Sequence, residues 1–499
     1  MSIRKVPMLI DGQEVFSDSG QWLDVLNPAT QDVVAQVPFA TLDEVERAVA
    51  SAKQAFATCR HVSLAKRQQF LLAFLQLVRD NTSHIAELIT LEHGKTLPDA
   101  EGEVGRGIEA IENACLITKL QLGELADNVA GNVNVYTLNK PLGVGVGITA
   151  FNFPVMLPCF MFPIAIACGN TFVLKPSEQD PSATLLLVQL AWQAGLPAGV
   201  LNVVHGGAEV ANFLAEHQDV KALSFIGSTH VGTSLYRRAS QAGIRAQCMM
   251  GAKNHCVVMP DANKEQAINH LLGSCFGAAG QRCMANSVAI LVGAARDWLP
   301  EIVAKAKTMT VDAGTNSNAD LGPLVSPQAK QRVQSLIATG VEQGATLLLD
   351  GRDPKVSGYP QGNFVAPTIF SDVSTTMDIY TQEIFGPVMC VLTADSLHSA
   401  IDIINANPNG NGTSIFTSSG WNARHFENHI DVGQIGINIP IPVPVAYFSF
   451  TGSRASKLGD LGPNGQQAVQ FWTQTHTVSA RWFEPDAVAD QMNTTITMK

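Results

Sequence analysis

The chain has 499 residues, of which 43 are acidic and 32 basic, so its formal net charge at pH 7 is −11. Hydrophobic residues make up 46% of the sequence and charged residues 15%, against about 25% charged residues in an average soluble protein. This composition excludes a disordered chain and predicts large buried cores in two or three domains. The acidic balance argues against a surface for nucleic acid or for an anionic membrane.

The nine cysteines are scattered along the chain and form no CxxC pair. This pattern is typical of a reducing compartment, and it predicts neither a disulfide framework nor a metal site. The first residues lack the apolar core of a signal peptide. The longest apolar run, 153–169, contains three prolines and is too short to cross a membrane, so we expect a buried helix there. These features predict a cytoplasmic protein.

Helical patterns come first in the chain and β-rich patterns follow. Residues 41–119 read as helices, with Thr41 as a cap for an amphipathic run and apolar residues at helical spacing over 64–78. Short β-rich runs then begin at Gly143, Asn170, Val200 and Lys221. Their separations predict right-handed crossovers and a parallel sheet covered on both faces, as in a nucleotide-binding domain. A second alternating region covers 256–450.

Two further segments, 132–138 and 474–483, alternate apolar and polar residues as half-exposed strands do. One interpretation is a small local sheet, and the other is an arm that pairs between subunits. The alternation favours neither over the other. The residues from Glu484 onward read as a polar tail.

Polar side chains follow the predicted strands, at the sheet edge where α/β proteins bind ligands. The amide of Asn152 could donate to an oxyanion, although an asparagine before Phe-Pro is more often a turn or cap residue. Lys175, Ser177 and Glu178 follow the second strand. The lysine and the carboxylate could reach ribose hydroxyls, and the carboxylate would disfavour the 2′-phosphate of NADP. A solvated charged loop is the simpler interpretation.

Two glycine-containing segments complete the set of candidates. Residues 227–232 end the fourth strand and open a helix whose N–H groups suit a pyrophosphate, although a plain glycine turn has the same spacing. Cys283 follows a glycine-rich run and directly follows Arg282, which suggests an electropositive setting that favours the thiolate. A lone cysteine is nevertheless more often a small buried hydrophobe.

Together these segments resemble the aldehyde dehydrogenase superfamily over essentially the whole chain. The motifs FNFP, KPSE, FIGST, GQRC and EIFGP occur in the order and at the spacing of that family. The resemblance implies an α/β fold with a Rossmann-like NAD-binding domain, an α/β catalytic domain and a small β oligomerisation arm. The implied boundaries are 1–126 and 142–253 for the NAD-binding domain, 254–450 for the catalytic domain, 127–141 and 470–485 for the arm, and 486–499 for a C-terminal tail.

The resemblance also implies the roles of individual residues. Cys283 matches the nucleophile, and its N–H and the Asn152 amide match the oxyanion hole. The cofactor is NAD, and the residues that match its binding site are Phe151, Lys175, Ser177, Glu178, Ser228, Met250, Glu383 and Phe385.

One departure narrows this interpretation. Hydrolytic members of the family have a glutamate that activates water at the position of Met249, and a thioether cannot accept a proton. The stretches MGAKNH and GQRCMA resemble the CoA-acylating methylmalonate-semialdehyde dehydrogenases, which also lack the glutamate. In these relatives asparagine is usual at the position of Met249, so the methionine is a small further departure of this chain from their pattern. The resemblance implies coenzyme A as the acyl acceptor.

The same subfamily holds the substrate carboxylate with two arginines, which Arg106 and Arg282 match. By pattern alone, Arg106 reads as a solvated arginine off the apolar stripe of its helix. We therefore expect oxidation of methylmalonate or malonate semialdehyde with decarboxylation, to propanoyl-CoA or acetyl-CoA. The alternatives are a hydrolytic aldehyde dehydrogenase and a catalytically silent scaffold. The expected partners are the semialdehyde, CoA and further copies of the chain, as a tetramer or a dimer.

Overall fold

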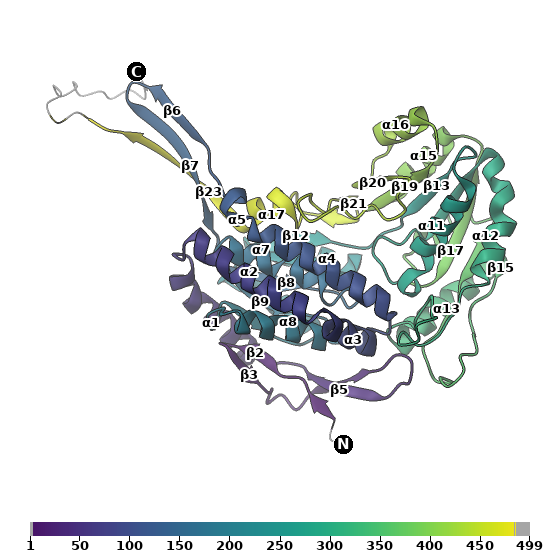
Figure 1. Cartoon of the computed structure of the whole chain (residues 1–499), viewed down its shortest axis with the longest axis horizontal. Coiled ribbons are helices and arrows are strands. Elements are labelled where there is room, and N and C mark those ends of the chain that lie inside the picture. Colours follow the sequence, from purple (N-terminus) through teal and green to yellow (C-terminus); the bar gives the residue numbers. More distant parts are fainter. Residues whose placement is uncertain (1–2, 484, 486–499) are drawn as a thin grey trace.

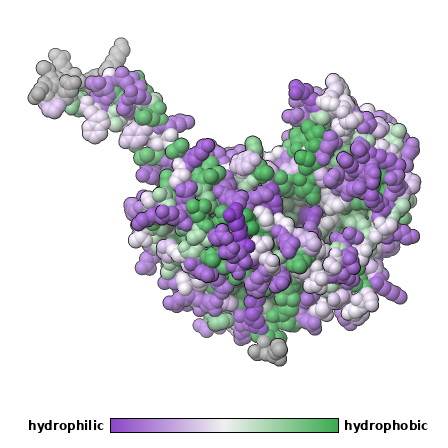
Figure 2. Space-filling view, viewed as in Figure 1, coloured by the Kyte–Doolittle hydropathy of each residue, from purple (hydrophilic) through white to green (hydrophobic). Residues whose placement is uncertain are grey.

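The computed structural model describes residues 3–483 and 485. Two α/β lobes lie side by side, and a three-stranded ribbon projects from the amino-terminal lobe (Figure 1). The space-filling view shows a hollow between the ribbon-bearing lobe and the other lobe (Figure 2). The predicted tail at 486–499 lies outside the described residues. No helix among the described residues is long and apolar enough to cross a membrane.

The amino-terminal lobe is built on an eight-stranded sheet with the order β22-β12-β11-β8-β9-β10-β2-β3. Its central strands are parallel, and four of them are the β-rich runs predicted from the sequence. The parallel strands are β8 (Val144–Ile148), β9 (Thr171–Lys175), β10 (Leu201–Val203), β11 (Val220–Ile226) and β12 (Arg245–Met249). The edges are antiparallel: β2 (Met8–Ile10), β3 (Gln13–Val15) and β22 (Lys457–Leu458).

Helices cover both faces of this sheet. They are α1 (Leu42–Cys59), α2 (Leu64–Asp80), α3 (Thr82–His93), α4 (Leu97–Cys115), α5 (Ile117–Leu120), α6 (Met156–Cys159), α7 (Phe162–Ala167), α8 (Ser182–Gln193), α9 (Ala208–Glu216), α10 (Thr229–Gln241) and α17 (Gly465–Trp472). Thr41 caps α1 as predicted, and Glu44 completes a capping box with it.

The prediction of one buried helix over 153–169 was wrong in part. The run is buried apart from the half-buried Phe153, but it forms two short helices, α6 and α7, with a break at 160–161. Proline lacks the N–H that a helix interior requires, and Pro163 lies in the first turn of α7, where no such donor is needed. The prolines therefore divide the run.

The second lobe contains a seven-stranded sheet with the order β15-β16-β17-β14-β13-β19-β20, parallel except for β15. Its strands are β13 (His255–Val258), β14 (Val288–Val292), β15 (Thr346–Leu349), β16 (Thr368–Ser371), β17 (Val388–Ala394), β19 (Gly412–Phe416) and β20 (Gln434–Ile437). Its helices are α11 (Lys264–Phe276), η1 (Gly277–Gly280), η2 (Gly293–Trp298), α12 (Leu299–Ala306), α13 (Pro327–Glu342), α14 (Asp378–Thr381), α15 (Leu397–Ala406) and α16 (Gly420–His429).

Two small sheets complete the lobes. The first joins β1 (Arg4–Lys5), β4 (Trp22–Leu26) and β5 (Val33–Pro38), and the second joins β18 (Asn409–Gly410) and β21 (Ser453–Arg454).

The projecting ribbon contains both alternating segments found in the sequence. Its strands are β6 (Leu125–Ala130), β7 (Val133–Pro141) and β23 (Thr473–Arg481), and β7 pairs antiparallel with the other two. The two segments thus form a local sheet within one chain. The ribbon ends in exposed aromatic side chains, with Trp482 82% and Phe483 73% exposed.

Candidate active site

Cys283 lies on a tightly constrained loop between η1 and β14. Ala278 and Ala279 have left-handed backbones, with φ of 50° and 53°, and Gly280 must be glycine because a Cβ there would lie 2.1 Å from a backbone oxygen of Gly386. Two side-chain amides then fix the carbonyl of Cys283. Asn254 donates to it at 2.8 Å and Asn411 at 3.0 Å.

The expected electropositive setting of Cys283 was wrong. Burial raises the pKa of the Cys283 thiol to about 12, and the nearby Glu383 carboxylate raises it further than Arg282 lowers it. The reason is local, because the Arg282 guanidinium pairs with Asp99. These surroundings favour the protonated thiol over the thiolate.

A cavity of about 680 Å³, which we call the Cys283 cavity, lies in front of this sulfur. Seven of the predicted residues line it: Phe151, Asn152, Ser228, Met250, Cys283, Glu383 and Phe385. The other lining residues are Ala150, Met156, Leu157, Phe160, Ile226, Gly227, Thr229, His230, Met249, Gly251, Arg332, Gln382, Asn411 and Phe450. Both lobes contribute, so the fold brings together motifs that are far apart in the sequence.

Asn152 follows β8 and presents its amide to the nucleophile loop. The residue is 3% exposed, and its side-chain nitrogen donates to the carbonyl of Gln281 at 3.1 Å, two residues before Cys283. A donor held at this position can stabilise negative charge on an oxygen that is bonded to the carbon attacked by Cys283.

Glu383 faces the cavity from the loop before β17. The backbone N–H of Ala252 donates to it at 3.1 Å, while burial raises the pKa of its carboxyl to about 7. Arg332 donates to the backbone oxygens of Glu383 and Ile384 at 2.6 Å. Lys253 donates to the backbone oxygens at 379 and 382. These bonds fix the loop that carries Glu383 and Phe385.

The start of α10 offers a place for an anion. Ser228 stands at its N-cap, and in the described part of the chain its side chain forms no capping bond, so the hydroxyl and the helix N–H groups can serve a ligand. The structure thus fits NAD on this side: α10 suits the pyrophosphate, and the Glu383 carboxylate suits ribose hydroxyls.

Three of the predicted cofactor residues are not among those that line the Cys283 cavity. Lys175, Ser177 and Glu178 follow β9, next to β8 in the sheet. Lys175 pairs with Glu178 at 3.1 Å and donates to the Pro176 carbonyl at 2.9 Å. Ser177 accepts a bond from the N–H of Gln179. Their role toward NAD stays a prediction.

The two arginines predicted to bind the substrate carboxylate are engaged elsewhere. Arg106 pairs with Glu109 at 2.5 Å and donates to the carbonyl of Pro444. Arg282 pairs with Asp99. Neither is among the described residues that line the Cys283 cavity.

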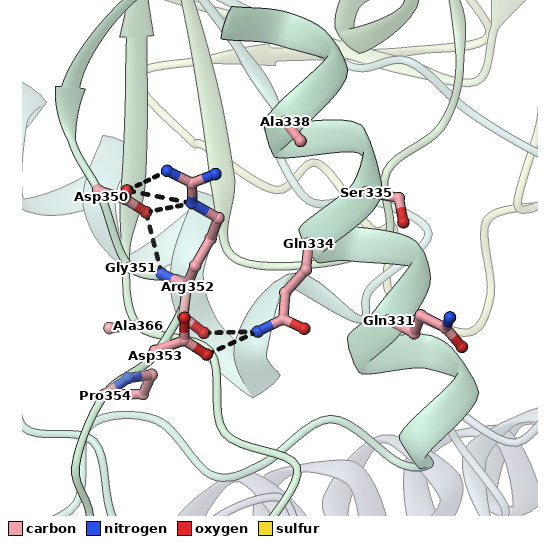
Figure 3. Close-up of a pocket in the computed structure, with 10 residues that line it drawn as sticks. All are labelled: Gln331, Gln334, Ser335, Ala338, Asp350, Gly351, Arg352, Asp353, Pro354 and Ala366. Atoms are coloured by element: carbon pink, nitrogen blue, oxygen red, sulfur yellow. Dashed lines mark hydrogen bonds and ion pairs between the residues drawn. The ribbon is translucent and has the colours of Figure 1, made fainter.

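A second cavity, which we call the Arg352 groove, has a volume of about 700 Å³. It lies between α13 and the segment after β15, and it contains none of the predicted residues. Its polar groups bind one another: Arg352 pairs with Asp350, and Gln334 donates to the Arg352 carbonyl and to Asp353 (Figure 3). The Cys283 cavity is therefore the candidate active site.

Comparison with known proteins decides the family. The sequence profile of the aldehyde dehydrogenase family matches residues 15–478. The chain belongs to the aldehyde dehydrogenase family. The predicted aldehyde dehydrogenase-like α/β fold is thereby confirmed.

Several relatives of this aldehyde dehydrogenase have names that describe an acylating reaction. The rat "methylmalonate-semialdehyde/malonate-semialdehyde dehydrogenase [acylating], mitochondrial" is 53% identical over 97% of this chain and 91% of its own length. The Arabidopsis thaliana "methylmalonate-semialdehyde dehydrogenase [acylating], mitochondrial" is 50% identical over 98% of this chain and 81% of its own.

Solved structures agree with these relatives. The methylmalonate-semialdehyde dehydrogenase of Oceanimonas doudoroffii is 44% identical and superposes with a TM-score of 0.95, covering 97% of this chain and 99% of its own. A Sinorhizobium meliloti protein assigned to the same enzyme, complexed with NAD, is 42% identical with a TM-score of 0.96 and the same coverage.

Met249 occupies the position at which hydrolytic members of the family have the water-activating glutamate, and its neighbours in the structure are apolar. Met249 is buried against Met284 and Phe450, in a cluster that the Cys283 side chain joins. Among the described residues that line the Cys283 cavity, Glu383 is the one carboxylate.

Sequence reasoning missed the residues that support the site. Asn254 and Asn411 hold the nucleophile loop, Arg332 holds the Glu383 loop, and Lys95 donates to the backbone of Asn152. Each acts on a backbone oxygen that is distant in sequence. In the sequence, candidate site residues were found as polar residues at the ends of predicted strands. Asn254 precedes β13 and Asn411 lies between β18 and β19, so neither showed this signal.

Proposed function

We propose that this aldehyde dehydrogenase oxidises methylmalonate and malonate semialdehyde with NAD and transfers the decarboxylated acyl group to CoA. The products are propanoyl-CoA and acetyl-CoA. The observation that carries the proposal is the pairing of Cys283 and Asn152 in one cavity whose water-activating position is the buried Met249. The acylating relatives and the NAD complex of a close structural neighbour support it.

The first step is the addition of Cys283 to the aldehyde carbon. The S–H bond breaks and a C–S bond forms, and the resulting oxyanion accepts bonds from the Asn152 amide and the Cys283 N–H. We propose Glu383 as the acceptor of the thiol proton, because its carboxyl lines the same cavity as Cys283 and burial raises the pKa of that carboxyl to about 7. NAD⁺, when held by the residues that we propose below, would supply the acceptor for the hydride that leaves the adduct carbon.

Oxidation leaves an acyl thioester on Cys283 with a carboxylate at the β position. Loss of CO₂ gives an enolate, which the same oxyanion donors can stabilise before a proton is added to its carbon. The CoA thiolate then displaces Cys283. This exchange needs no activated water, which agrees with the thioether at position 249.

Arg106 and Arg282 are the groups that we propose for the substrate carboxylate. A guanidinium can bind a carboxylate through two parallel hydrogen bonds. Arg282 would have to exchange Asp99 for the substrate, and Arg106 would have to turn from Pro444.

We propose three groups of contacts for NAD. The rings of the cofactor lie beside Phe151, Met250 and Phe385. The adenosine is bound by Lys175, Ser177 and Glu178, the pyrophosphate by Ser228, and ribose hydroxyls by Glu383.

We also propose that the protein is cytoplasmic and that it forms a homo-oligomer, either a tetramer or a dimer. The exposed apolar side chains on β6 and at the end of the ribbon support contact with another copy, and nine free cysteines support a reducing compartment. The domain boundaries at 126, 141, 253, 450, 470 and 485 are likewise proposals.

A product assay with and without CoA tests the function. Without CoA, we expect a burst of about one NADH per active site and then slow turnover. Adding CoA should restore turnover and release acyl-CoA and CO₂ in equal amounts. Equally fast turnover without CoA, with free propanoate as the product, would refute the acylating assignment in favour of hydrolysis with Glu383 as the water base.

A further inference from the structure

A lysine–glutamate pair lies inside the protein directly behind Asn152. Lys95 precedes α4 and Glu103 lies within it, and their side chains are 1% and 0% exposed. The ammonium and carboxylate groups are 2.7 Å apart. Apolar residues of similar volume often stabilise a fold as well as a buried ion pair does, so stability alone does not explain these two charges.

The pair holds both ends of the segment that carries the oxyanion donor. The ammonium of Lys95 donates to the backbone oxygen of Asn152 at 2.7 Å. The other oxygen of Glu103 accepts the N–H groups of Val155 at 2.8 Å and Met156 at 3.2 Å. Hydrogen bonds to ionised groups are shorter and stronger than neutral ones, so the segment 152–156 is fixed at both ends.

The backbone next to Lys95 is in turn packed against the lobe that carries Cys283. The N–H of Leu97 donates to the carbonyl of Gly314 at 3.0 Å. A Cβ at Gly314 would lie 2.3 Å from the carbonyl oxygen of Lys95. The backbone at Gly314 and the backbone at Lys95 are therefore in direct contact, with no side chain between them. Lys95 therefore connects the Asn152 segment of one lobe with the nucleophile's lobe.

We propose that Lys95, held by Glu103, is a positioning residue for the oxyanion donor. It fixes the main chain at Asn152 so that the side-chain amide meets the oxygen that becomes charged after attack by Cys283. A misplacement of about 1 Å in such a donor can cost about 100-fold in rate. The inference rests on the proposed function only through the oxidation step, and it is independent of the acyl acceptor.

A double-mutant cycle with Asn152 tests the proposal. The measured quantity is the rate of the NADH burst without CoA, at saturating NAD and with an aldehyde that the wild-type chain oxidises. Asn152→Ala alone should slow the burst by about 10²–10³. Lys95→Met should slow it at least about tenfold in the wild-type background, and less than about twofold when Asn152 is already alanine. An equal loss in both backgrounds would mean that Lys95 acts without Asn152, and it would overturn the proposal.

The chain offers a matched control for Glu103. Glu92, in α3, is also a buried carboxylate that accepts a backbone N–H, that of Ser182 at 2.9 Å. Ser182 begins α8, so Glu92 binds the start of that helix, whereas Glu103 binds the segment 152–156. Glu103→Gln should slow the burst about tenfold, and Glu92→Gln should change it less than about twofold even if both lower the melting temperature. Equal slowing by both variants would assign the effect to general destabilisation and overturn the proposal.

Folding failure need not end the experiment. If Lys95→Met leaves Glu103 unpaired and the protein does not fold, the variant Lys95→Met/Glu103→Met removes both charges and enters the same cycle. A wild-type chain that forms NADH but no acyl-CoA would refute the acyl transfer alone and leave this test intact.

Discussion

The Cys283 cavity and the Arg352 groove have nearly the same volume, about 680 and about 700 Å³, but their polar groups are used differently. In the groove, Arg352 and Asp350 neutralise each other on the same loop. In the cavity, the Asn152 amide and the Glu383 carboxylate are held by backbone groups of distant segments and face the thiol. Size therefore does not distinguish the sites, whereas polar groups directed at one reactive atom do.

The largest expected effect comes from removing that reactive atom. Cys283→Ala should abolish NADH formation from either semialdehyde, because no covalent adduct can donate the hydride. NAD binding, measured by calorimetry, should persist because the cofactor contacts that we propose lie on other residues. Residual turnover near the wild-type rate would remove Cys283 as the nucleophile and with it the distinction between the two cavities.

The protonation state of Cys283 sharpens the comparison. Burial raises its pKa far above the ordinary value of about 8.5, so the thiolate fraction rises tenfold per pH unit throughout the neutral range. Alkylation of Cys283 by iodoacetamide, without NAD, should accelerate about 100-fold between pH 7 and pH 9. Mass spectrometry of the peptide gives the rate, and a plateau below pH 8 would contradict a thiol buried in this way.

Substrate charge should matter in the Cys283 cavity. Arg106→Leu should raise KM for the carboxylated semialdehydes about ten- to 150-fold, the loss of one charged hydrogen-bond partner. Propanal has no carboxylate and serves as the control substrate, so its KM should change little. If both substrates lose equally, Arg106 supports the loop at Pro444 and does not bind substrate.

The smallest effect is expected in the Arg352 groove. Arg352→Ala removes an exposed pair with Asp350, and such pairs contribute about 0–1 kcal/mol to stability. Steady-state rates with CoA should stay within about twofold of wild type. A loss comparable to that of Arg106→Leu would show that the groove takes part in activity.

The sequence predicted the parallel strands around β8 and β9 because buried β-rich runs and their separations are local patterns. It also predicted seven residues that meet in the Cys283 cavity. Local pattern made Asn152, the segment with Ser228, and Cys283 candidates, whereas Phe151, Met250, Glu383 and Phe385 came only from the resemblance to a known family. The thiol's environment was not predictable in this way. The charge of Arg282 is a sequence fact, but its pairing with Asp99, 183 positions earlier, depends on how α4 packs.

The same limit applies to Lys95. Its sequence context shows only a lysine between two helices, and nothing local indicates that its ammonium reaches the backbone of Asn152. Contacts to backbone oxygens carry no residue pattern of their own, because every residue has the same carbonyl. Such supporting residues become visible only when the fold is known.

The edge strand β22 and the helix α17 have a consequence for how the chain is made. Both come from near the end of the chain, yet β22 completes the first lobe's sheet and the fully buried Trp472 of α17 packs on Phe172 at 5.5 Å. During synthesis, the first lobe must wait for these residues to leave the ribosome, after the whole second lobe has emerged. Until they do, β12 lacks its edge partner and Phe172 lacks Trp472, and unpaired strand edges and exposed apolar surface of this kind are prone to aggregation.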